Sequence, residues 1–202
     1  MELFEYDKQV IEKFGIVCGV DEAGRGPLAG DVYAAAVIFD KDTIIEGIND
    51  SKKLSAKKRD LLFDIIIEKA KAYSIATASI EEIEDINILN AAMLAMKRAV
   101  EGLNIEPNIA LIDGNKIPDL NCRAYAVVKG DATSQCIAAA SILAKVARDR
   151  YMQKIAEEYP QYKFEKHKGY GTKLHYEMLA EHGISPVHRP SFLKKLVWIN
   201  DN

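Results

Sequence analysis

The stretch that decides the fold is GVDEAGRGPLAG, residues 19–30. It lies between two apolar runs, Ile16 to Val20 and Val32 to Phe39, which predict two strands. Asp21 and Glu22 close the first strand, where successive side chains point to opposite faces. The two acids can serve one site only if the chain bends, or if one of them also lends its backbone carbonyl. The glycines that follow make a bend possible, because glycine tolerates positive φ and close approach of a ligand.

This turn does not match the common phosphate-binding loops. It lacks the Gly-Lys-Ser/Thr ending of a P-loop, and its glycines, at 24, 26 and 30, precede a β-rich run instead of opening a helix. The adjacent acids would repel phosphate unless a cation stood between them, which favours a hard divalent metal with oxygen ligands. The alternative at this point is a tight turn carrying two solvated acids.

Length and composition predict one domain, residues 1–202, with 49% hydrophobic residues available for a core. The N-terminus lacks the layout of a secretory signal, and no apolar run approaches a membrane span. Three widely spaced cysteines, without a C-x-x-C pair, predict buried free thiols in a reducing compartment. We therefore expect a cytoplasmic protein without a membrane anchor.

Charge is distributed unevenly along the chain. The segment from Ser141 to Lys195 holds eleven Lys/Arg and six Asp/Glu, a net of +5, which leaves −8 for the rest of a chain whose total is −3. A basic segment, about 141–195, beside an acidic remainder suits a phosphate-binding face next to a metal-binding one. Ordinary scatter of charges is the alternative.

Hydrophobic periodicity predicts an α/β protein. Strands are expected at 16–20, 32–39, 72–80, 109–113 and 122–128, and helices at 1–14, 55–71, 86–100, 133–158 and 172–182. Short connections favour antiparallel pairing of the first strands. The buried run before Asp113 follows a helix, which favours a parallel crossover. The acidic run 81–85 is expected to be a solvated helix start.

Two further acids fall where a sheet presents ligands. Asp113 ends a buried strand, and ligands gather at the carboxyl ends of such strands in α/β sheets, although an Asp-Gly turn is the alternative. Asp131 lies at the start of the long helix, where a plain N-cap is the alternative. Below it, one helix face is expected to press against a phosphate backbone; its members are Asp131, Ser134, Ala138, Ser141, Lys145 and Arg148.

The second distinctive stretch is KHKGYGT, residues 166–172. Tyr170 stands between two glycines after a basic run that includes Lys168, a pattern that suits nucleotides because charge holds the backbone and the ring stacks. The alternative is a turn in which Tyr170 covers the core. A polar loop at 49–55 contains Lys52 and has the composition of either a phosphate contact or a solvated helix entry. The four histidines show no zinc spacing, and His175 and His182 are interpreted as packing or surface residues.

Together, DEAGRGPLAG and KHKGYGT resemble the motifs of bacterial ribonuclease HII, the type 2 ribonuclease H, and the resemblance extends over nearly the whole chain. It implies the ribonuclease H-like fold, a mixed five-stranded sheet flanked by helices, with a helical C-terminal part. It also implies that Asp21, Glu22, Asp113 and Asp131 are the catalytic acids and metal ligands for Mg²⁺ or Mn²⁺, two ions with substrate bound. The implied substrate contacts are Gly24, Arg25, Gly26, Lys52, Ser141, Lys145, Lys168 and Tyr170.

The implied reaction is hydrolysis of the RNA strand of RNA–DNA hybrids, and incision 5′ to single ribonucleotides embedded in DNA, leaving 3′-hydroxyl and 5′-phosphate ends. Divalent ions can supply this chemistry, so no side-chain nucleophile is required. The turn at Gly24-Arg25-Gly26 is expected to sense the 2′-hydroxyl, the group that distinguishes RNA from DNA. Another metal-dependent nuclease of the same fold, or a non-catalytic nucleic-acid-binding module, is the alternative. A monomer is expected.

Overall fold

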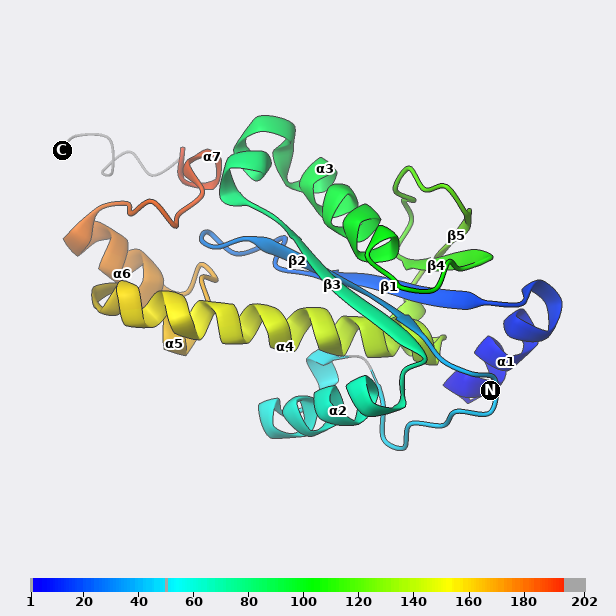
Figure 1. Cartoon of the computed structure of the whole chain (residues 1–202). Coiled ribbons are helices and arrows are strands. Elements are labelled where there is room, and N and C mark those ends of the chain that lie inside the picture. The colour runs from blue at the N-terminus through cyan, green and yellow to red at the C-terminus, as the bar shows by residue number, and fades with distance from the viewer. Residues whose placement is uncertain (1, 50, 195–202) are drawn as a thin grey trace.

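A mixed five-stranded sheet runs through the centre of the molecule in the order β3-β2-β1-β4-β5 (Figure 1). This is a computed structural model, and it describes residues 2–49 and 51–194, with the side chain of residue 52 left out. β2 pairs antiparallel with β1 and β3, whereas β4 pairs parallel with β1 and β5. The strands are β1 (Val17–Ala23), β2 (Val32–Ile38), β3 (Ala72–Ala78), β4 (Ile109–Asp113) and β5 (Arg123–Val127). The predicted α/β class and mixed sheet are confirmed.

Helices connect and cover the strands. They are α1 (Leu3–Phe14), α2 (Ala56–Lys69), α3 (Ile80–Glu101), α4 (Gln135–Glu158), α5 (Phe164–His167), α6 (Lys173–His182) and α7 (Pro190–Leu193). Within the described ranges, 3₁₀ turns occur at Ser51–Lys53, Gly130–Ala132 and Pro160–Tyr162. Ser55 is the N-cap of α2, because its hydroxyl accepts a hydrogen bond from the Lys58 amide.

The acidic run 81–85 begins the third helix, as predicted, and the helix continues through the periodic stretch 86–100. Ser79 and Glu82 form a reciprocal capping box that starts α3 at Ile80. Glu82 also receives two hydrogen bonds from Arg98, at 2.8 and 2.6 Å, one from each terminal nitrogen of its guanidinium group. The helix is interrupted at Asn87, whose φ is 67°, close to the residue where periodicity alone placed its start. Local capping therefore sets the first residue of α3, ahead of the periodic apolar stretch.

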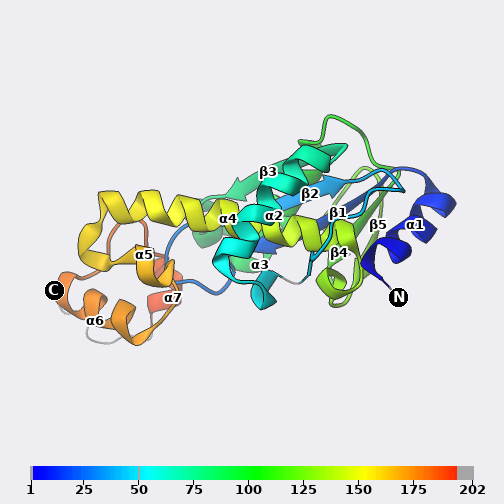
Figure 2. The ribbon, with the colours of Figure 1, turned by 90° about the horizontal axis from the view of Figure 1, so that it is seen from below.

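The two faces of the sheet carry separate apolar cores. On one face, α3 packs against side chains such as Val20 and Ile112. On the other, α2 and α4 pack against side chains such as Ala35 and Val37 (Figures 1 and 2). α4 approaches β1 so closely that a Cβ on Gly19 would lie 2.2 Å from the Cys136 carbonyl carbon. The absence of a side chain at Gly19 therefore lets the first turn of α4 pack directly on the backbone of β1.

The C-terminal part lies beyond the sheet, around the far end of α4 (Figure 2). Residues of α4 to α7 form a third core with Leu28 and Ala29, which belong to the loop after β1. The loop that begins with the Gly24-Arg25-Gly26 turn is therefore anchored in this C-terminal core. No helix among the described residues is long and apolar enough to cross a membrane. The three cysteines are free, and Cys122 is only half-buried, which corrects the expectation that all three are buried.

Candidate active site

Parallel pairing of β1 and β4 brings two of the predicted acids together. Val20 of β1 lies opposite Ile112 of β4, and both pack under α3. The next residues along the two strands are Asp21 and Asp113, which therefore share the opposite face, under α4. The expected juxtaposition of the first and fourth strands is confirmed, and Asp113 is close enough to raise the pKa of Asp21.

Asp21 is the buried member of this group, with 6% of its surface exposed. Its Oδ1 accepts a hydrogen bond of 2.7 Å from the Glu22 amide, and Ser141 of α4 also hydrogen-bonds its carboxyl group. Burial raises its pKa well above 3.8, and the negative charges of Glu22 and Asp113 raise it further. The protein thus holds a carboxyl group where its ionised form is unfavourable until a positive charge arrives.

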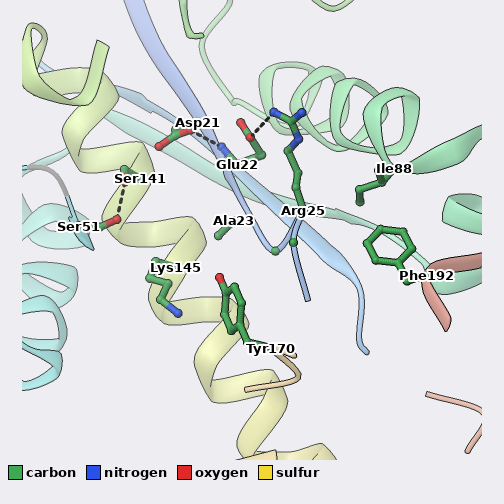
Figure 3. Close-up of a pocket in the computed structure, with 12 residues that line it drawn as sticks. Asp21, Glu22, Ala23, Arg25, Ser51, Ile88, Ser141, Lys145, Tyr170 and Phe192 are labelled. Atoms are coloured by element: carbon green, nitrogen blue, oxygen red, sulfur yellow. Dashed lines mark hydrogen bonds and ion pairs between the residues drawn. The ribbon is translucent and has the colours of Figure 1, made fainter. Parts of the chain in front are cut away.

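Glu22 points to the other side of the strand, towards Arg25. Its Oε1 lies 3.2 Å from a terminal nitrogen of the Arg25 guanidinium (Figure 3). The pair is partly exposed, with 49% of the Arg25 side chain accessible. The prediction that adjacent acids face opposite sides of the strand is therefore confirmed, and Glu22 is engaged by the arginine of the neighbouring turn.

Asp113 ends β4, and Asp131 lies in the 3₁₀ turn just before α4. The Asp113 Oδ1 accepts a hydrogen bond of 2.7 Å from the Gly130 amide, which connects β4 to the 3₁₀ turn containing Asp131. A Cβ on Gly130 would lie 3.1 Å from that oxygen and 2.5 Å from the Ile137 Cδ1, so a larger residue would have to displace one of these side chains. Ser134, and not Asp131, is the N-cap of α4, because its hydroxyl accepts from the Ile137 amide. The N-cap alternative for Asp131 is wrong.

A cleft of about 450 Å³ opens beside Asp21 and Glu22 (Figure 3). Eight of the candidate residues line it, together with four that sequence reasoning did not assign to the site. The candidates are Asp21, Glu22, Gly24, Arg25, Gly26, Ser141, Lys145 and Tyr170, and the others are Ala23, Ser51, Ile88 and Phe192. Asp113, Asp131 and Lys168 do not line this cleft, and the side chain of Lys52 is outside the described residues.

The two glycine-flanked motifs face each other across the cleft. A Cβ on Gly26 would lie 3.9 Å from the ring of Tyr170, which is 40% exposed. The Leu28 amide donates to the Gly169 carbonyl at 2.8 Å, which fastens the two loops together. Gly24 has a φ of +102°, a conformation that favours glycine, and a Cβ there would lie 2.2 Å from the Arg148 Nε. Both the backbone conformation and the close packing of Arg148 therefore favour glycine at this position.

Lys145 and Arg148, the two basic residues on the predicted face of α4, have different surroundings. Lys145 lines the cleft, with its Nζ 2.7 Å from Asp149 and 5.5 Å from the centre of the Tyr170 ring. Arg148 is fully buried and donates to the carbonyls of Asp31, Ala29 and Lys168, so its predicted contact with a phosphate backbone is wrong. Helical periodicity identified the face, but the C-terminal core covers its lower end.

Two other predicted contacts are engaged within the protein. The Ser141 hydroxyl lies 2.7 Å from that of Ser51, and Ser141 is only 5% exposed, so it contacts Asp21 more than it contacts solvent. The Lys168 Nζ donates to the Glu165 carbonyl at 2.9 Å. Ser141 therefore lines the cleft as a partner of other protein groups, whereas Lys168 does not line it.

The donor set fits a hard divalent cation in its chemistry. It offers carboxylate oxygens alone, and the buried charge of Asp21 is opposed by two further acids, which a cation would offset. In the described residues, no three Asp, Glu, His or Cys side chains are already gathered as a metal site. Glu22 is turned to Arg25 and Asp113 to Gly130, so side-chain rotation would have to complete the set.

Sequence reasoning missed the residues that hold the two loops. His188 and Arg189 precede α7, are fully buried, and lie against the loop after β1. Their positions carry no periodic signal. A histidine and an arginine side by side before a proline indicate a basic tail as readily as a core.

Comparison with known proteins identifies the family. The family model described as Ribonuclease HII matches residues 18–200. The Ribonuclease HII of Caldicellulosiruptor bescii is 56% identical over 195 residues, which cover 96% of this chain and 95% of that protein.

Solved structures agree with this assignment. The crystal structure of the ribonuclease H2 from Pyrococcus horikoshii OT3 superposes with a TM-score of 0.76 at 26% identity, covering 91% of this chain and 97% of that one. The structure of Bst-RNase HIII in complex with Mn²⁺ shares the fold, with a TM-score of 0.59 at 16% identity over 82% of this chain and 70% of that one. The chain therefore belongs to the ribonuclease HII family of metal-dependent endoribonucleases.

Proposed function

We propose that the protein hydrolyses the RNA strand of RNA–DNA hybrids and cuts on the 5′ side of single ribonucleotides embedded in duplex DNA. The products are a 3′-hydroxyl and a 5′-phosphate. The observation that carries the proposal is the meeting, in one cleft, of the Asp21 carboxyl group, the Gly24-Arg25-Gly26 turn and the Tyr170 ring. An acidic site alone is compatible with many nucleases. A backbone turn that faces an aromatic ring can in addition hydrogen-bond one sugar and pack against the next, which favours recognition of a ribonucleotide.

We assign the metal site to Asp21, Glu22, Asp113 and Asp131, with Mg²⁺ or Mn²⁺ as the cation. Bound in a pair, such ions activate water and stabilise the attacking and leaving oxygens of an in-line phosphodiester displacement. The structure of Bst-RNase HIII in complex with Mn²⁺ supports the metal class. Ser141 keeps Asp21 in place from α4 and lowers its pKa, which favours the ionised form that a cation needs.

We assign substrate selection to the two facing loops. The backbone groups of Gly24, Arg25 and Gly26 are close enough to the cleft to hydrogen-bond a 2′-hydroxyl. The Tyr170 ring would pack on the sugar of the next nucleotide, and Lys145 would lie beside the backbone phosphates. Lys52, Ser141 and Lys168 are proposed as peripheral contacts, and the basic segment 141–195 as the substrate-binding part of a single domain.

One assay tests the function. A labelled DNA duplex with one embedded ribonucleotide is incubated with and without Mg²⁺, beside an all-DNA duplex. We expect incision only with the ribonucleotide and the metal, and none by Asp113→Asn, which should still bind the duplex. Binding without any product by the native protein would indicate a non-catalytic module, and cutting of the all-DNA duplex would indicate another nuclease of this fold.

A further inference from the structure

Two consecutive buried residues, His188 and Arg189, lie between the loops assigned to substrate selection. Their segment runs antiparallel to the loop after β1, with an isolated bridge between Ala29 and His188. The Arg189 amide donates to the Leu28 carbonyl at 2.8 Å, and the Leu28 amide donates to the Gly169 carbonyl at 2.8 Å. The backbone of Leu28 is thus hydrogen-bonded through its carbonyl to Arg189 and through its amide to the loop that carries Tyr170.

Arg189 holds the loop after β1 from within. Its guanidinium donates to the carbonyls of Gly24 at 2.8 Å, Arg25 at 3.2 Å, Pro27 at 2.9 Å and Gly30 at 2.8 Å. Burial, and to a smaller extent the nearby charge of Arg148, lower its pKa to about 9. Arg189 is therefore charged at neutral pH, and its planar fork serves four carbonyls at fixed angles, which the single ammonium of a lysine does not.

His188 reaches the other loop through a second histidine. The Ser185 amide donates to His188 Nδ1 at 3.0 Å, so that nitrogen is an acceptor and the proton of the neutral ring is on Nε2. His188 Nε2 then donates to His175 Nε2 at 3.1 Å. The remaining proton of His175, on Nδ1, is donated to the Tyr170 carbonyl at 3.0 Å. An amide cannot accept and a carbonyl cannot donate, so the direction of this chain is fixed.

Both rings are neutral under ordinary conditions. Burial, and to a smaller extent a neighbouring histidine, lower the pKa of His175 to about 4 and that of His188 to about 3. His167 stacks on His175 with 4.3 Å between ring centres, and its Nδ1 accepts from the Gly169 amide at 3.2 Å. The loop of Tyr170 is therefore held at two successive backbone positions by neutral imidazoles.

We propose that His188 and Arg189 are a positioning pair that sets the spacing between the Gly24–Gly26 turn and Tyr170. That spacing decides how well the cleft accepts a ribose followed by a deoxyribose. This rests on the proposed function, because it assigns the two loops to neighbouring sugars. The pair contacts no substrate; it acts through the backbone of one loop and, by way of His175, through the backbone of the other.

The test is a double-mutant cycle between His188 and Tyr170. Incision is measured on a duplex with one embedded ribonucleotide, where a deoxyribose follows the ribose, and on a uniform RNA–DNA hybrid. We expect His188→Leu to lower kcat/KM on the embedded ribonucleotide about tenfold, mainly through kcat, and to affect the uniform hybrid much less. His188→Leu/Tyr170→Ala should match Tyr170→Ala alone, because the histidine acts only through the tyrosine loop.

Three further variants separate positioning from general packing. His188→Gln keeps an amide donor near Nε2 and should restore most of the preference for the embedded ribonucleotide. Ser185→Ala removes only the contact of 2.8 Å between the Ser185 hydroxyl and His188 Nδ1. It keeps the ring and its hydrogen bonds to the Ser185 amide and to His175, so it should show a smaller loss in the same direction. Arg98→Lys removes an arginine fork far from the cleft and should leave the ratio of the two substrates unchanged.

Two results would overturn the proposal. One is equal loss on both substrates in His188→Leu and Ser185→Ala; the other is losses that simply multiply when either is combined with Tyr170→Ala. Either would assign His188 to general stability. Absence of incision by the native protein and by Arg98→Lys would instead contradict the proposed function itself, so the two failures are distinguishable.

Discussion

The cleft has two walls of opposite electrostatic character. At the ends of β1 and β4, the buried carboxyl group of Asp21 faces the negative charges of Glu22 and Asp113. At the two loops, the buried guanidinium groups of Arg148 and Arg189 face carbonyl oxygens and satisfy them. The negative charges of the first wall repel one another until a metal cation binds, whereas the carbonyl oxygens of the second wall are hydrogen-bonded before any ligand binds.

This difference separates chemistry from recognition. Like charges held together in a poorly solvated place cost stability and recover it when a cation binds. Loops whose carbonyls are already hydrogen-bonded lose little conformational freedom on binding, which favours discrimination between similar sugars. The protein therefore holds its recognition surface rigid and leaves its catalytic acids dependent on a ligand.

The largest expected effect comes from removing the buried charge. Asp21→Asn should reduce incision about 10⁴-fold or more, as loss of one member of a catalytic unit does. It should also stabilise the metal-free protein at pH 8 by about 0.5–2 kcal/mol, within the range of single stabilising substitutions, because a buried like charge disappears. Urea unfolding in a chelator, followed by activity with Mg²⁺, measures both.

The stability gain has a defined pH dependence. The pKa of Asp21 is raised in the folded protein, so ionisation is disfavoured there and the native protein loses stability as pH rises from 3.8 through the raised value. The advantage of Asp21→Asn should thus vanish at low pH. The control is Asp119→Asn, whose side chain is 99% exposed. A destabilised Asp21→Asn at pH 8 would contradict the picture of an incomplete charge cluster.

A smaller effect is expected at the recognition wall. Tyr170→Ala should lower kcat/KM on an embedded ribonucleotide about 10- to 100-fold, the scale of one lost ring contact with a nucleotide. Stability should change little, because the ring is 40% exposed. Tyr125→Ala, an exposed tyrosine on β5, is the matched control and should leave the kinetics unchanged. Unaltered kinetics in Tyr170→Ala would remove the ring from recognition.

The smallest expected effect comes from breaking the ion pair between Arg25 and Glu22, which connects the glycine turn to the acidic wall. Arg25 of the turn pairs with Glu22, and a partly exposed pair contributes about 0.2–1 kcal/mol. Arg25→Ala should free Glu22 and lower the Mg²⁺ concentration for half-maximal incision by up to about fivefold, while KM for the duplex rises. Arg150→Ala, which breaks the exposed pair with Asp60, is the control. An unchanged Mg²⁺ requirement would show that Glu22 is not restrained by Arg25.

Much of the architecture followed from local sequence. Apolar runs placed the strands, the hydroxyl of Ser55 placed the N-cap of α2, and the resemblance of two motifs indicated the fold. Other features depended on packing. Helical periodicity could not show that Arg148 is covered, because the carbonyls that it contacts lie elsewhere in the chain.

The sequence by itself determined the chemistry that the molecule carries: acids after a strand, a glycine-rich turn, and an aromatic ring between glycines. Only the tertiary structure decided how these parts meet. Parallel pairing set Asp21 beside Asp113, and buried hydrogen bonds from Arg189 and the histidines joined two loops about 140 residues apart in the chain. Residue identity fixes what a side chain can donate, accept or bind, whereas distance and burial decide which partners it finds.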